Sequence, residues 1–221
     1  MRKLVILLAV ICSIASCGKE EIYSCDPEAN MWVKSNITEI QQMTRADFLA
    51  IGDIVYMRAA YAAFTSNQRQ ALWVGKLEEI LKLDWSEQES HHIQSILNLI
   101  KENSFIFSKD RDQEAFDKVE VEIYRLSEYA QEELGWDNYL WASISATPQM
   151  LNEDKTINLV KSNLRTSSTL KSRAEGGICD CSIDSFDWCF FPVFRTCVGA
   201  PCESLGKCGT LWTYDCDGIC I

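Results

Sequence analysis

The cysteines of this 221-residue chain are gathered toward its C-terminal end. No cysteine occurs between Cys25 and Cys179, whereas residues 177–221 contain eight. A 45-residue segment buries too little apolar surface to fold without cross-links. The sequence therefore predicts one part that makes its own core and a tail that is held together through sulfur. The tail cysteines are Cys179, Cys181, Cys189, Cys197, Cys202, Cys208, Cys216 and Cys220.

Zinc and disulfides are the two available kinds of cross-link. The gaps between successive tail cysteines are one, seven, seven, four, five, seven and three residues, so the Cys-x2-Cys spacing of zinc knuckles is absent from residues 177–221. Those residues also contain no histidine. We therefore predict four disulfides, no metal site and no cofactor. Eight cysteines allow 105 pairings, and the sequence leaves the connectivity open.

The start of the chain is typical of an export signal. Residues 1–16 combine basic Arg2 and Lys3 with an apolar run, which predicts a signal peptide too short to span a membrane. The run Ile14-Ala15-Ser16-Cys17 matches a bacterial lipobox, which predicts cleavage before Cys17 and its acylation. The alternative is an ordinary secretory signal followed by a chance cysteine.

Residues 17–25 are predicted to be a lipidated tether. Gly18-Lys19-Glu20-Glu21 is similar to the tag that sends some lipoproteins to the outer cell surface, and a plain solvated tether is the alternative. We expect an exported, membrane-anchored lipoprotein at the outer membrane or cell surface. Cysteines in such an oxidising compartment are mostly paired in disulfides, although Cys25 is left as an odd one.

Residues 26–146 show helical periodicity throughout. Asp26-Pro27 predicts a helix start, Ser86 to Glu89 predicts a capping box, and Gly135 predicts a helix end. The predicted fold class is mainly α: an N-terminal bundle of five or six helices, followed by a small, irregular, disulfide-rich module with short β-hairpin content. We expect the adjacent His91 and His92 to lie on the surface. The clearest apolar stripe is Phe116, Val119, Ile123, Leu126, Ala130 and Leu134.

A polar segment separates the two predicted domains. Residues 147–176 are rich in serine and threonine and carry a net charge of +2, and we interpret them as a linker between a helical domain at 26–146 and a cysteine-rich module at 177–221. The whole chain has a formal charge of −11, and residues 26–146 alone carry −10. Nucleic acid is therefore not an expected partner.

The cysteine pattern resembles one known family. The runs CDCSIDSFDWC and GKCGTLWTYDCDGIC are similar to the cysteine-rich tail of fulvocin C-related proteins, named after a small bacteriocin. Ala71-Leu72-Trp73 and the run SEQES add a similar rhythm in the helical part. The resemblance implies that the chain is related to a bacteriocin. It does not by itself imply that the chain kills bacteria.

The tail contains an apolar run that is unusually long for so small a module. The tail as a whole is acidic, with a net charge of −4 over residues 177–221, which argues against a cationic attack on anionic lipid. The apolar side chains either cover the disulfides or remain exposed as a binding patch for a protein or membrane target on neighbouring bacteria. The candidate patch consists of Trp188, Phe190, Phe191, Val193 and Phe194.

No catalytic motif is found in the sequence, so we expect a protein that is not an enzyme. Two functions remain. In one, the chain is a bacteriocin-like lipoprotein whose tail acts on competing bacteria, either tethered or released by proteolysis. In the other, it is a non-toxic cell-surface module whose tail recognises a ligand or partner.

Overall fold

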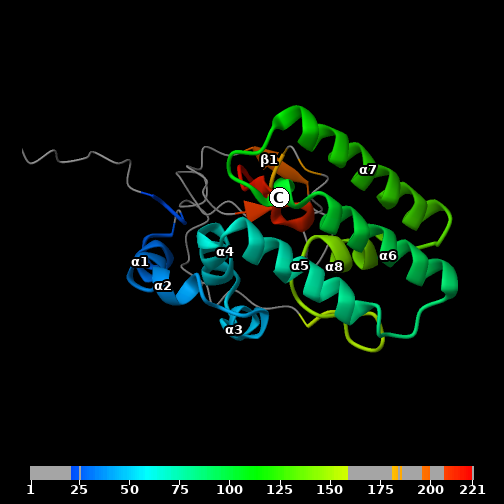
Figure 1. Ribbon diagram of the computed structural model, residues 1–221, viewed down its shortest axis with the longest axis horizontal. Coiled ribbons are helices and arrows are strands. Elements are labelled where there is room, and N and C mark those ends of the chain that lie inside the picture. The colour runs from blue at the N-terminus through cyan, green and yellow to red at the C-terminus, as the bar shows by residue number, and fades with distance from the viewer. Residues whose placement is uncertain are drawn as a thin grey trace, which may run out of the picture.

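The computed structural model describes residues 21–24, 26–158, 181–183, 185, 196–199 and 207–220 (Figure 1). The described chain is mainly helical with a C-terminal region of short strands, which confirms the predicted fold class. Its elements are α1 (Pro27–Ser35), α2 (Ile37–Ile40), α3 (Arg45–Ala50), α4 (Ile54–Ala63), α5 (Ser66–Ile80), α6 (Glu87–Glu102), η1 (Ser104–Phe107), α7 (Gln113–Glu132), α8 (Asn138–Ser145), β1 (Cys197–Gly199), β2 (Lys207–Cys208), η2 (Thr210–Trp212), β3 (Tyr214–Asp215) and β4 (Gly218–Cys220).

Capping residues in the local sequence set the ends of several helices. The Asp26 side chain accepts a hydrogen bond from the Ala29 N–H at 2.7 Å, and Pro27 is the first residue of α1, as expected. Ser86 and Glu89 form the predicted capping box at the start of α6. Gly135, at φ +66°, follows the end of α7 in the left-handed conformation that favours glycine.

The helices pack around one core, with contacts both between consecutive helices and between α1 and α4. Helix α5 packs against α6 and η1, α7 lies along α6, and α8 contacts α7. Figure 1 shows α1, α2 and α3 gathered at one end of the molecule, with α4 leading to the longer helices. Eight α-helices are described in place of the expected five or six, because the segment before α4 divides into three short helices. The largest fully buried side chains include Trp73, Tyr61, Phe48, Lys76, Phe107 and Phe116.

A buried lysine ties helix α5 to the end of α8. Lys76 of α5 is fully buried and donates hydrogen bonds to the carbonyls of Ser143, at 2.6 Å, and Thr147, at the C-terminal end of α8. Burial, together with the nearby Arg45, holds the pKa of the Lys76 ammonium well below its usual range. A hydrogen-bond donor at a helix C-terminus pairs the carbonyls that have no partner within the helix, so Lys76 has a structural role.

His92 is buried, and the prediction of a surface histidine pair is wrong for this residue. Its side chain is 3% exposed, stacks on Tyr129 at 5.3 Å and lies edge-on to Trp136 at 5.3 Å, while His91 is exposed. Burial lowers the pKa of His92 to about 4, so the imidazole is neutral at pH 7. Adjacent helical residues point about 100° apart, which allows one to face the core.

The first part of the predicted linker packs on the helices. Residues 147–158 are described, and Leu151 and Ile157 pair across an antiparallel bridge with both side chains buried. The guanidinium of Arg45 donates to the Pro148 carbonyl at 3.1 Å. Residues 147–158 therefore pack as part of the helical body. The polar composition that suggested a linker comes from the exposed residues between the buried ones. The other linker residues lie outside the described part of the chain.

Candidate functional site

The described end of the tail contains a hairpin that is closed at its base. Strands β2 and β3 pair antiparallel, with Lys207 opposite Asp215 and the two side chains in an ion pair at 2.5 Å. A disulfide joins Cys208 to Cys216 across the hairpin. The loop at residues 209–213 is therefore held at both ends.

The tip of this hairpin lies inside the core of the helical body. Trp212 is 3% exposed, and its ring meets Tyr61 at 5.3 Å and Phe48 at 6.3 Å, both in edge-on geometry. The indole N–H donates a hydrogen bond of 2.9 Å to the carbonyl of Ala146, directly after α8. Leu211 is buried beside it.

Tyr61 of α4 joins the hairpin to the helices through its hydroxyl. The hydroxyl donates to the Leu211 carbonyl at 3.0 Å and accepts from the indole N–H of Trp73 at 3.1 Å. Complete burial raises the pKa of the Tyr61 hydroxyl, so it stays protonated and keeps its donor role. The polar atoms that the hairpin brings into the core are thereby paired.

The hairpin tip adopts a backbone conformation that is costly by itself. Leu211 and Trp212 have φ of +56° and +50°, the left-handed region that costs a non-glycine residue about 1–2 kcal/mol. Gly209, at φ +79°, has no room for a side chain, since a Cβ would come within 2.6 Å of Ser185 Oγ and of Tyr214. Burial of Trp212 offsets this strain, because a fully buried tryptophan stabilises by several kcal/mol.

Polar contacts surround the inserted tip. Arg111 donates to the carbonyls of Thr213, at 2.8 Å, and Ile106, at 3.2 Å, and so bridges the hairpin to η1. Tyr214 donates its hydroxyl hydrogen to the carboxylate of Glu120 on α7. The hairpin thus contacts α4, the end of α8, η1 and α7.

The division into a helical domain at 26–146 and a cysteine-rich, disulfide-stapled module at 177–221 stays a prediction. The described part of the tail shares its core with the helices. The sequence could not reveal this, because Leu211 and Trp212 fit packing against disulfides as well as packing against a distant helix. Tyr61 and Phe48 have no pattern that distinguishes them from ordinary core residues, so their role could not be predicted from the sequence.

A second ribbon of the tail lies at the surface. Strands β1 and β4 pair antiparallel, and a disulfide joins Cys181 to Cys197. Ile183 is 53% exposed and Val198 is 41% exposed, so this ribbon presents apolar side chains outward while the hairpin turns them inward.

Several predicted site residues cannot be placed. Two disulfides are found among the tail cysteines, which confirms that part of the tail is cross-linked. Cys220 belongs to β4, and its side chain is not described. Outside the described residues lie Cys17, Cys25, Cys179, Cys189, Cys202 and all five members of the candidate patch, Trp188, Phe190, Phe191, Val193 and Phe194.

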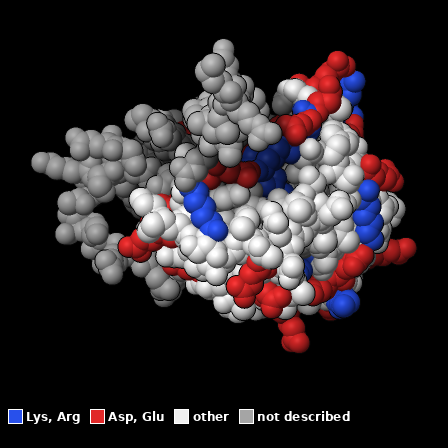
Figure 2. Space-filling view, turned by 60° about the vertical axis from the view of Figure 1, so that its left-hand side comes forward, with Lys and Arg blue, Asp and Glu red and all other residues white. Residues whose placement is uncertain are grey.

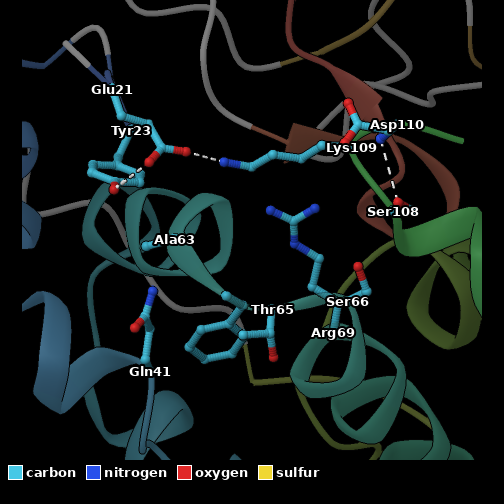
Figure 3. Close-up of a pocket in the computed structure, with 11 residues that line it drawn as sticks. Glu21, Tyr23, Gln41, Ala63, Thr65, Ser66, Arg69, Ser108, Lys109 and Asp110 are labelled. Atoms are coloured by element: carbon cyan, nitrogen blue, oxygen red, sulfur yellow. Dashed lines mark hydrogen bonds and ion pairs between the residues drawn. The ribbon is translucent and has the colours of Figure 1, made fainter. Parts of the chain in front are cut away.

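A polar pocket of about 280 Å³ lies where four segments meet (Figure 3). Its walls come from residues 21–23, the α4–α5 junction, the loop before α7 and Gln41. Arg69 of α5 points into it, and Lys109 reaches across it to an ion pair with Glu21 (Figure 3). No motif in the sequence joins these positions, so the pocket could not be predicted from the sequence.

The Glu21 carboxylate organises one wall of the pocket. Its hydrogen bonds with Lys109 and with the Tyr23 hydroxyl, the latter at 2.9 Å, hold the pKa of Glu21 below its usual value. Burial and the bond to Glu21 raise the pKa of Tyr23 to about 12. We call this site the Arg69 pocket.

Neither a metal centre nor a membrane span emerges from the described chain. Its His, Cys, Asp and Glu side chains form no group of three suited to holding an ion. Its helices also fall short of the length and apolar character needed to cross a bilayer. The two disulfides indicate an exported protein that reaches an oxidising compartment.

Comparison with known proteins gives no match to a family model, a curated protein or a solved structure. The resemblance to fulvocin C-related proteins therefore rests on the cysteine motifs, and it stays a prediction.

Proposed function

We propose that this chain is a lipid-anchored cell-surface module in which the helices and the tail act as one body, and that the tail recognises a protein or membrane partner. The observation that carries this proposal is the insertion of Trp212 between Tyr61 and Phe48. Release of the tail by proteolysis would expose Trp212 to solvent and remove a buried side chain from the helical core. The tail is better suited to presenting a surface while it stays attached.

The recognition surface in this proposal is the apolar run Trp188 to Phe194, which lies outside the described residues. The exposed side chains of Ile183 and Val198 support it, because they show that the tail leaves apolar groups at its surface. Aromatic anchors of this kind often dominate an interface, where loss of one costs about 2 kcal/mol or more.

The anchor in this proposal is an acylated Cys17 at the outer membrane or cell surface. Palmitate labelling and intact mass test it directly. We expect labelling that Cys17→Ala abolishes. An unmodified N-terminus, or labelling that survives the change, would refute the anchor and leave the tail's role to be tested separately.

The tail's role is tested by adding oxidised mature chain, and separately its 174–221 segment, to a panel of related bacteria. We expect the full chain to bind cells without inhibiting growth, and Phe191→Ser or Phe194→Ser to abolish binding in protein that retains its disulfides. Val121→Ala, at an exposed apolar position on α7 outside the tail, is the matched control and should bind normally.

Growth inhibition is the outcome that favours the bacteriocin-like function instead. Inhibition by residues 174–221 alone would show that the tail acts without the helices, and it would overturn the proposal of one attached body. Absence of both binding and inhibition would refute a bacterial surface as the target.

A further inference from the structure

Arg69 carries a buried positive charge in the Arg69 pocket without a carboxylate beside it. The residue is 4% exposed, and no described carboxylate lies within ion-pair distance of its guanidinium. Burial lowers the pKa of Arg69, as does the charge of Arg111, while charge interactions with Tyr61, Asp215 and Glu21 raise it. A buried charge without a close counter-ion is costly, which makes an anion a favourable addition at this place.

The guanidinium retains donors for such an anion. Its three nitrogens donate to the carbonyls of Tyr61 (3.1 Å), Phe107 (3.1 Å) and Ala62 (2.8 Å). A guanidinium has five N–H donors, so these three bonds leave two donors without a partner among the described atoms. The terminal nitrogens point toward the space beneath the Lys109–Glu21 pair (Figure 3).

Lys109 supplies a second cation that is able to move. Its ion pair with Glu21 is exposed, with both side chains 54% accessible, and exposed pairs of this kind contribute little stability. An anion placed over Arg69 would compete with the Glu21 carboxylate for the same ammonium group. Figure 2 shows basic side chains recessed in a hollow of the molecule, with acidic side chains next to them.

The pocket's other groups limit what it accepts. Thr65 and Ser66 line the wall at the start of the 15-residue helix α5, where the helix dipole favours negative charge. The Thr65 hydroxyl is bonded to Gln68 in the capping box of that helix. The carboxylate of Asp110 also lines the pocket and disfavours an anion with several charges at that side. About 280 Å³ suits a small polar group better than a bulky ligand.

We infer that the Arg69 pocket binds a small oxyanion, a carboxylate or phosphate group, between Arg69 and Lys109, with Glu21 as the internal group it displaces. The residues that line this pocket are not those of the tail's proposed recognition surface, and the inference does not depend on the function proposed for the tail.

The test is a titration of the full mature chain with inorganic phosphate and, separately, with acetate at constant ionic strength, followed by amide chemical shifts. We expect saturable shifts at residues 65–69 and 108–110 with at least one of the two probes. The probe that binds more tightly identifies the oxyanion as phosphate or carboxylate.

Three variants decide whether binding occurs as inferred. Lys109→Gln should weaken binding about fivefold, the effect of losing one modest ion pair. Glu21→Gln should strengthen it, because the competing carboxylate is removed. Lys101→Gln removes a comparable exposed ion pair, with Glu78, and should leave binding unchanged.

Three outcomes would overturn the inference. The first is the absence of saturable shifts with both probes in the unmodified chain. The second is equal weakening by Lys101→Gln and Lys109→Gln, which indicates diffuse attraction to surface charge. The third is weaker binding in Glu21→Gln. None of these outcomes bears on binding of the tail to cells, so the two proposals fail independently.

Discussion

Replacing Trp212 with alanine should destabilise the whole helical body, although Trp212 lies in the tail. The change removes a side chain that is 3% exposed, two edge-on aromatic contacts and the hydrogen bond to the Ala146 carbonyl. Truncation of a buried tryptophan to alanine typically costs about 3–5 kcal/mol in free energy of unfolding. The positive φ of Trp212 carries the same backbone penalty for alanine, so the change relieves no strain and the expected cost is not reduced.

The measurement is urea unfolding of the disulfide-intact chain, followed by the far-ultraviolet circular dichroism of the helices. We expect a lower midpoint and an unchanged slope, since the amount of surface exposed on unfolding stays similar. Val198→Ala, at an exposed position of the same tail, should cost less than about 0.5 kcal/mol. A helical transition that Trp212→Ala leaves unmoved would refute a shared core and restore the prediction of two independent domains.

Three further changes test other parts of the structure. Cys208→Ser with Cys216→Ser, measured by the same unfolding assay, should cost about 2–4 kcal/mol, because the hairpin loses the cross-link that holds its tip in place; no loss would contradict that role. Gly209→Ala should cost more than about 1 kcal/mol, since it combines an unfavourable φ with contacts of 2.6 Å, and a neutral effect would mean that the tip relaxes freely. His92 has a pKa of about 4 in the folded chain against about 6.5 when unfolded, so its contribution to stability is present above pH 6.5 and is lost as the pH falls through 4. His92→Gln should therefore flatten the profile of unfolding free energy against pH between these two values. An unchanged profile would show that His92 does not titrate in this way.

The helical architecture could be predicted because its signals are local. Asp26 and Ser86 start helices through side-chain bonds to residues three positions away, and Gly135 ends one through its backbone conformation. The stripe that begins at Phe116 repeats within a single helix. Such signals need no knowledge of which helices meet in space.

The sites depend on contacts between distant positions, and the sequence carries no local sign of them. Tyr61 and Leu211 are 150 residues apart, and Lys109 and Glu21 are 88 apart. A buried lysine such as Lys76 follows no apolar period, since its partners are backbone carbonyls of another helix. Cysteine spacing indicated cross-links in the tail, but it contained no information on the helical surface that receives Trp212.

The most direct test of the shared core is to cut the chain and ask whether its parts stay together. A protease site placed within residues 159–180 of the full mature chain, which lie outside the described part, allows cleavage without touching the described contacts. A non-reducing denaturing gel first establishes that no disulfide joins the two fragments. Size-exclusion chromatography under native conditions should then give one species containing both fragments, and the same cut in the Trp212→Ala variant should release the tail. Separation of the fragments in the unmodified protein would contradict the account that the tail completes the helical core.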